Sequence, residues 1–301
     1  MNNNDVKAAA FFMIISVTGF SVMDLTVKWT TEHYPIGEVI FFRMIFGIIP
    51  LIFVVPRDRW KNLFETKKPG LHFVRCFTGT CALFAIYAAL HYLPLAQAVS
   101  LSFASPIFST ILSIIILHEV VRAKRWLAII LGFVGVCVLV NPFSASFSIY
   151  MVLPLIFCFF FAMVSISIRK LSETEPTYIV ALFFTIFGII ASLFTIPIFG
   201  GWKLPTSSFD LFILLCVGVS GGIGNLALTS AFKNAEVSIV TPLKYLSLIY
   251  AVIFGYLIWG EIPAWNTYIG AILIIISSLI ILRRETVLKK NIRPETLAVN
   301  R

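Results

Sequence analysis

Residues 41–49 read Phe41-Phe42-Arg43-Met44-Ile45-Phe46-Gly47-Ile48-Ile49, and residues 182–190 repeat this pattern as Leu182-Phe183-Phe184-Thr185-Ile186-Phe187-Gly188-Ile189-Ile190. Six of the nine positions are identical at an offset of 141. Other residue pairs recur at an offset of 141 or 142, namely Pro35 with Pro176, Lys28 with Lys170, Ala89 with Ala231, and Glu119 with Glu261. A nearly constant offset over so much of the chain indicates an internal duplication.

The composition around this repeat is that of a membrane protein. Of the 301 residues 59% are apolar and only 12% are charged, and the mean hydropathy is +0.97. A soluble chain of this length would need far more polar surface to cover its core. Apolar runs that approach the length of a bilayer-crossing helix predict ten spans, at residues 8–30, 35–55, 71–91, 95–117, 125–141, 147–168, 177–198, 209–232, 236–259 and 265–283.

The duplication divides these spans into two sets of five. Because five is an odd number, the second set must enter the membrane upside down relative to the first. We therefore predict an all-α integral membrane fold of two inverted five-helix repeats, residues 1–145 and 146–284, followed by a basic tail at 285–301. Inverted repeats are a design of secondary transporters, whose substrate site lies near the bilayer midplane between the repeats.

Charges in the loops predict the orientation. The loops and the C-terminal tail on the side of the N-terminus hold seventeen Lys and Arg residues, whereas the opposite loops hold only Lys203. The positive-inside rule then predicts that both termini are cytoplasmic. The net charge of +9 is therefore a topology signal and does not indicate a nucleic-acid partner. The sequence contains no Walker A motif and no catalytic or metal-ligand pattern, so we expect no ATP-driven pump, no enzyme and no metal or other cofactor.

Charged residues inside apolar spans are candidates for function, because burying a charge in the membrane is costly. Asp24 and Lys28 lie one turn apart on the first span, where they can pair, or Asp24 can contact a substrate or a proton. Arg43 enters the second span about as deeply as Asp24, and it can pair with Asp24 or bind an anionic group. Arg75, near the inner end of the third span, either reaches lipid phosphates or lines the inner mouth of the path.

The strongest candidate is Lys244, which lies in Thr241-Pro242-Leu243-Lys244-Tyr245. The proline frees a backbone carbonyl near midplane, and a cation beside it predicts a substrate contact, with Tyr245 adjacent. Ser102 and Ser105 precede Pro106 in the matching stretch of the first repeat, and their hydroxyls can bond to a substrate or to the backbone. Glu119 and Glu261 close matching spans. We interpret these two residues, together with Lys28 and Arg75, as gate or structural charges.

Several stretches resemble the drug/metabolite transporter superfamily, in particular its EamA-type carriers. They are Phe42-Arg43, Ala89-Leu90-His91-Tyr92-Leu93-Pro94, Pro106 thirteen residues before Glu119, and Gly260-Glu261. Within that superfamily the sequence is similar to the S-adenosylmethionine uptake carriers of obligate intracellular bacteria, through Asp24-x-x-x-Lys28, Lys68-Pro69-x-x-His72-x-x-Arg75 and Trp202-x-Leu204-Pro205. Ser247 departs from that group, which has Glu after the Tyr-Leu pair. The resemblance implies a central cavity that opens to each side in turn.

These observations predict a bacterial inner-membrane transporter for a small zwitterionic metabolite, with S-adenosylmethionine uptake as the leading interpretation. An exporter of amino acids, other metabolites or drugs and a riboflavin uptake carrier are alternatives on the same fold. A membrane interaction protein without transport is the alternative from another class. We expect a small-molecule substrate and membrane lipid as partners. The sequence leaves energy coupling and the choice between monomer and homodimer open. The predicted substrate contacts are Asp24, Arg43, Ser102, Ser105, Lys244 and Tyr245.

Overall fold

The structure is a computed structural model that describes residues 3–56, 66, 68–117, 123–141, 147–171, 174–195, 201–203, 205–234 and 241–280. Within these ranges the regular secondary structure is entirely helical, as the sequence predicts. Glu119, which is predicted to be a gate charge, lies outside the described residues, and so does the basic tail at 285–301.

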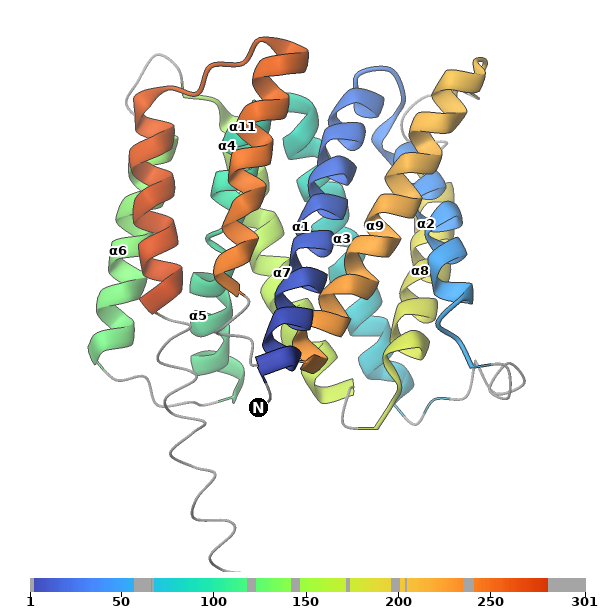
Figure 1. Cartoon of the computed structure of the whole chain (residues 1–301), viewed down its shortest axis with the longest axis horizontal. Coiled ribbons are helices and arrows are strands. Elements are labelled where there is room, and N and C mark those ends of the chain that lie inside the picture. Colours follow the sequence, from blue (N-terminus) through green and yellow to red (C-terminus); the bar gives the residue numbers. More distant parts are fainter. Residues whose placement is uncertain are drawn as a thin grey trace, which may run out of the picture.

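The helices stand side by side, and successive spans run in opposite directions, with α4 and α5 as two parts of one span (Figure 1). The first half contains α1 (Asn3–Thr31), α2 (Ile36–Ile52), α3 (Pro69–Tyr92), α4 (Leu95–Ser102), α5 (Ser105–Leu117) and α6 (Ala123–Val140). The second half contains η2 (Ile149–Met151), α7 (Val152–Leu171), α8 (Thr177–Leu193), α9 (Ser208–Asn234), η3 (Thr241–Tyr245), α11 (Leu246–Trp259) and a last helix at Trp265–Ile280.

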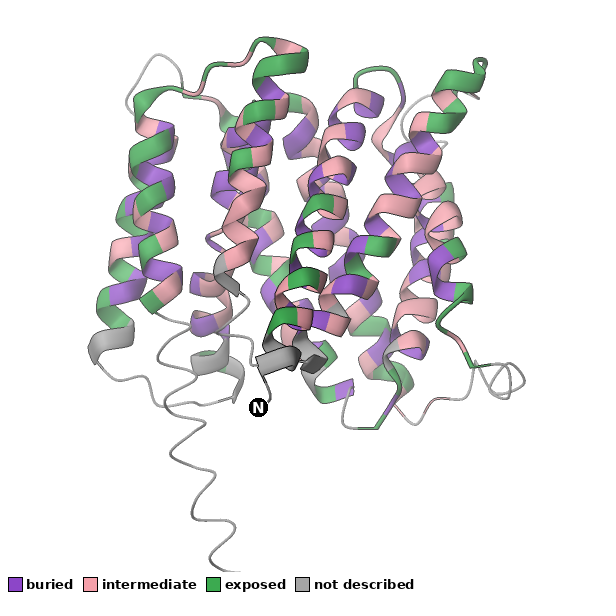
Figure 2. Cartoon of the chain, in the orientation of Figure 1, coloured by how far each residue is buried: buried purple, intermediate pink, exposed green. Residues whose placement is uncertain are grey.

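Among the described residues, five helical stretches are long and apolar enough to cross a membrane, namely Lys7–Thr31, Pro69–Tyr92, Leu95–Leu112, Ile149–Ile168 and Ser208–Leu228. Shorter apolar helices accompany them, such as Tyr178–Leu193 and Trp265–Ile280. Large apolar side chains are exposed on the outside of the bundle, and Phe53 is 85% exposed. Figure 2 shows exposed residues distributed along the outer helices. Such a surface fits contact with lipid, and the helices satisfy their own backbone groups there.

The predicted span at 95–117 is divided by a break at Phe103 and Ala104, between α4 and α5. Pro106 causes this break because it has no N–H to donate to the carbonyl four residues earlier, that of Ser102. The Ser105 hydroxyl donates to the Ser102 carbonyl instead, at 2.6 Å, and Ser278 of the last helix donates to the Phe103 carbonyl at 3.1 Å. Side chains therefore replace the helical bonds that the break removes.

Small residues allow α9 to pack tightly between α1 and α2. A Cβ atom on Gly19 of α1 would lie 3.0 Å from the Ser220 carbonyl oxygen and 3.2 Å from the Cα of Gly224. On the other face of α9, a Cβ on Gly222 would lie 2.6 Å from the ring of Pro50 in α2. The glycines at 218, 221, 222 and 224 thus serve close helix packing.

A second close crossing joins α6 to the last helix, and we predict that it does not accept an added methyl group. A Cβ on Gly270 would lie 2.7 Å from the Gly135 carbonyl oxygen and 2.8 Å from the Leu139 backbone nitrogen. Because both neighbours are backbone atoms, Gly270→Ala should cost about 1–3 kcal/mol and lower the apparent melting temperature of the purified protein. The matched control is Gly70→Ala, whose Cβ would meet nothing within 4 Å. Equal melting temperatures for the two variants would contradict this packing.

Candidate functional site

Four polar side chains of α1, α2 and α3 lie in the interior of the bundle. Arg43 of α2 lies within electrostatic range of Asp24 on α1 and of Arg75 and Tyr87 on α3. Asp24 and Arg43 form no direct ion pair in the described structure. We call Asp24, Arg43, Arg75 and Tyr87 the arginine cluster. Because Asp24 and Arg43 lie at similar depths in their spans, the sequence predicted this part of the arginine cluster.

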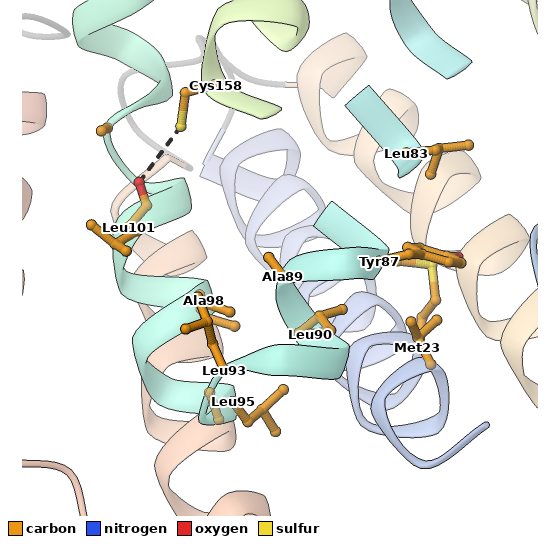
Figure 3. Close-up of a cluster of buried hydrophobic side chains, with 14 of the residues drawn as sticks. Met23, Leu83, Tyr87, Ala89, Leu90, Leu93, Leu95, Ala98, Leu101 and Cys158 are labelled. Atoms are coloured by element: carbon orange, nitrogen blue, oxygen red, sulfur yellow. Dashed lines mark hydrogen bonds between the residues drawn. The ribbon is translucent and has the colours of Figure 1, made fainter. Parts of the chain in front are cut away.

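Apolar groups hold the arginine cluster in position. The guanidinium of Arg75 lies over the ring of Phe184 in α8, 4.0 Å from its centroid. Tyr87 is fully buried and belongs to the same apolar cluster as Met23 of α1, and Figure 3 shows these two side chains next to each other. Arg75 therefore points into the bundle, and the alternative in which it reaches toward lipid phosphates does not describe this structure. The sequence analysis did not single out Tyr87.

The break in the first half meets the irregular segment of the second half. Phe103, in the break between α4 and α5, and Tyr245, in η3, have ring centroids 5.0 Å apart. The Tyr245 hydroxyl donates to the Ile275 carbonyl at 3.5 Å. The Ser102 hydroxyl donates to the Ala98 carbonyl at 2.8 Å, so Ser102, like Ser105, bonds to backbone in this conformation. Figure 3 shows the end of α4 and the bond from the Cys158 thiol to the Leu101 carbonyl.

Lys244 lies on η3, away from the arginine cluster along the axis of α1. Its neighbours Leu243 and Leu246 pack against a group of α1 residues that includes Met13 and Val17. Arg43 instead lies beside Gly221, whose other neighbour is Met23 of α1. Since a helix rises 1.5 Å per residue, about six residues of α1 correspond to about 9 Å. The candidate cations from the sequence therefore do not form one group.

A buried ion pair joins the two halves at the end of the bundle opposite the N-terminus. Lys28 is only 5% exposed, and its Nζ lies 2.9 Å from Oε1 of Glu261 and donates to the Leu93 carbonyl at 2.7 Å. Oε2 of Glu261 accepts from the Leu95 backbone nitrogen, in the first turn of α4, at 2.8 Å. Lys28 thus pairs with Glu261 rather than with Asp24, and it is buried rather than directed toward water.

Local sequence explains how Glu261 reaches this position. Gly260 follows α11 in the left-handed conformation, with φ of 65°, which glycine adopts without strain. The Glu261 backbone nitrogen then donates to the Gly255 carbonyl, so the chain turns directly over the end of α11. A Cβ on Gly255 would lie 2.8 Å from Oε2 of Glu261, so the carboxylate needs glycine there. We call Lys28 and Glu261 the outer pair.

A cavity of about 340 Å³ lies next to the outer pair, between α4, η2 and α11. Its lining is mixed, because Met151 and Ala251 contribute apolar surface while Gln97 and Glu261 contribute polar atoms. The amide of Gln97 contacts the Met151 sulfur at 3.7 Å. The sequence analysis did not identify Gln97, since a single amide in an apolar run gives no periodic signal.

The opposite end of the bundle has a buried ion pair of its own. The Nε2 atom of His72, in the first turns of α3, bonds to Glu175, which lies between α7 and α8. Both side chains are buried, and the hydroxyl of Thr66 donates to the same carboxylate. The sequence analysis did not predict this pair, because its two members are about a hundred positions apart and lie in different repeats.

Comparison with known proteins identifies a family. The profile described as "EamA-like transporter family" matches residues 7–141 and again residues 148–283. The pseudopaline exporter CntI of Pseudomonas aeruginosa is 31% identical over 283 residues, which cover 93% of this chain and 98% of that protein. The S-adenosylmethionine uptake transporter of Rickettsia conorii is 31% identical, over 91% and 92% of the two chains.

A riboflavin transporter of Vibrio cholerae is 26% identical, over 96% of this chain and 97% of that protein. One solved crystal structure shares the fold, with a TM-score of 0.63 and 17% identity over 92% of this chain and 98% of that chain. The matching proteins therefore extend over nearly the whole chain.

The outer pair generates a prediction about stability. Lys28→Gln and Glu261→Gln should each lower the apparent melting temperature, because each leaves the other charge buried without its partner, at a cost of about 3–5 kcal/mol. The double variant should lose less than the sum of the single variants, since it removes both charges together. Lys170→Gln, at an exposed residue, is the control. Additive losses would contradict the pairing.

Proposed function

The chain belongs to the EamA-like transporter family, and we propose that it is a secondary transporter that moves a small zwitterionic metabolite by alternating access. Its apolar helices and its bacterial relatives make it a multi-pass membrane protein. The proposal includes a bacterial inner-membrane location with both termini in the cytoplasm, on the basis of the positive-inside bias. S-adenosylmethionine taken up into the cell is our leading candidate substrate.

Two inverted five-helix repeats, residues 1–145 and 146–284, are part of this proposal. The double match of the family profile supports them, and so does the pattern of helix contacts. The α1 helix packs along α9, and α3 packs along α7, which is the same pairing with the two halves exchanged. In the same way α5 packs on α7 while α11 packs on α1. A rocking of one repeat against the other would then expose an interior site to each side in turn.

The observation that carries the substrate class is the presence of both signs of charge in the interior of the bundle. Asp24 is a candidate contact for a positive group, while Arg43 and Lys244 are candidate contacts for a negative group. A zwitterion such as S-adenosylmethionine carries both kinds of group. Tyr245 would orient the substrate from η3, and Ser102 and Ser105 would contribute hydroxyls from the break between α4 and α5.

We assign the outer pair to the gate on the extracellular side. Lys28 and Glu261 connect α1, the start of α4 and the end of α11, so separating these helices requires their bonds to break. Glu119 holds the equivalent position in the first repeat and is proposed as a gate charge on the inner side.

Export of an amino-acid-derived metabolite is the second candidate function. The observation that favours it is the relationship to the pseudopaline exporter, which is as similar to this chain as the S-adenosylmethionine transporter of Rickettsia conorii. Ser247, in place of the acidic residue of the uptake carriers, also weakens the argument for a cationic substrate. Riboflavin uptake, suggested by the Vibrio cholerae relative, would not need an interior cation.

Uptake of labelled S-adenosylmethionine tests the proposal. Bacterial cells that express this chain should accumulate the label in a saturable manner, in competition with S-adenosylhomocysteine, whereas cells with an empty vector should not. Lys244→Ala should reduce the uptake rate at least tenfold because it removes an interior cation, whereas Lys170→Ala, at an exposed residue, should not. Absence of uptake, with the protein present in the membrane, would exclude this substrate. Flux in inverted vesicles and riboflavin uptake would then test the alternatives.

A further inference from the structure

We propose that Arg43 and Arg75 form the subsite that binds a carboxylate group of the transported solute, with Tyr87 as an additional donor. This inference rests on the proposed transport function and identifies its principal anion contact. From the sequence alone, Arg75 either reaches lipid phosphates or lines the inner mouth of the path, and Lys244 has the leading role. The geometry of the arginine cluster assigns that role to the two arginines.

The first argument is the balance of charge. Arg43 and Arg75 are both cationic and lie within electrostatic range of each other, so they repel. Asp24 lies within range of Arg43 and supplies one negative charge. The arginine cluster therefore carries a net positive charge. A buried charge without a partner is costly, and an anionic group such as a carboxylate would neutralise it.

The second argument is the set of donors that have no acceptor. Among the described residues, Nε of Arg43, Nε and Nη1 of Arg75 and the hydroxyl of Tyr87 are buried without a hydrogen-bond partner. Buried polar atoms normally have partners, so several in one place indicate a missing acceptor. A carboxylate has two oxygens that accept about four hydrogen bonds, and its planar shape matches the guanidinium fork.

Close packing also holds the guanidinium of Arg75 in place. A Cβ on Gly79 would lie 2.5 Å from Nη1 of Arg75, so this nitrogen lies against the glycine backbone. The contact between Arg75 and the Phe184 ring holds the guanidinium without consuming its N–H donors. Arg75 is therefore fixed in one orientation before an anion arrives, which lowers the entropic cost of binding.

Two buried side-chain pairs at the ends of the bundle provide the contrast. Lys28 has Glu261 and the Leu93 carbonyl as partners, and His72 has Glu175. Arg43 and Arg75 form no ion pair in the described part of the chain, which is expected of a binding site and not of a structural ion pair.

The first experiment measures stability and needs no substrate. Arg75→Met removes the charge but keeps the length of the side chain and a favourable sulfur contact with Phe184. We expect its apparent melting temperature to rise by about 2 °C or more, because an unneutralised charge has been removed. Lys28→Met, which breaks an existing pair, should lower it. A fall for Arg75→Met similar to that for Lys28→Met would overturn the inference.

The second experiment uses acetate as a probe for the carboxylate subsite. Millimolar acetate, compared with chloride at equal ionic strength, should raise the apparent melting temperature of the purified wild-type protein. The response should disappear in Arg43→Met and Arg75→Met and persist in Lys170→Met, at an exposed residue. Loss of the response in Lys244→Met alone, or no response in the wild type, would overturn the inference in favour of another anion site.

The two proposals fail in different ways. If acetate stabilises the wild type through the arginines but S-adenosylmethionine is not transported, the subsite stands and the leading substrate is excluded. If S-adenosylmethionine is transported, its decarboxylated analogue should compete at least tenfold less well against the wild type. Arg75→Met should abolish that difference. An equal preference in the wild type would show that the carboxylate is not recognised, although transport itself would stand.

Discussion

The absence of water in the hydrocarbon core is the constraint on which the rest of this structure depends. Every backbone polar group there must find a partner within the protein, which favours helices. The break between α4 and α5 is tolerable because Ser105 and Ser278 donate to the carbonyls that Pro106 leaves unpaired. Irregular backbone is therefore confined to the interior, where Phe103 meets Tyr245 and where a transporter needs a site.

The same constraint applies to charged side chains and separates two classes of them. The outer pair joins two opposite charges, and His72 bonds to Glu175. These two contacts connect distant segments at opposite ends of the bundle. The arginine cluster is not neutralised, and its donors remain unfilled. Because the fold is held by pairs at its ends and by glycine-mediated crossings such as Gly19 with Gly224, it tolerates an unpaired charge in its middle.

The outer pair and the arginine cluster share a helix, which would link the proposed gate to the proposed site. Lys28 and Asp24 lie one turn apart on α1, so a movement of α1 that separates Lys28 from Glu261 also moves Asp24 relative to Arg43. An anion bound by Arg43 and Arg75 would change the charge that Asp24 experiences. Binding in the interior and opening at the end would thus be coupled through a single rigid helix.

The sequence sufficed for everything that depends on local pattern. Hydropathy and the repeat of residues 41–49 predicted the helical class and the helix positions. It also suggested that Asp24 and Arg43 lie at similar depth. Pairing between distant residues could not be predicted, since Lys28 finds Glu261 across the two halves and Arg75 turns inward onto Phe184. Helical periodicity fixes which residues share a face of one helix, whereas helix crossings fix which faces meet, and the partners of buried charges follow from those crossings.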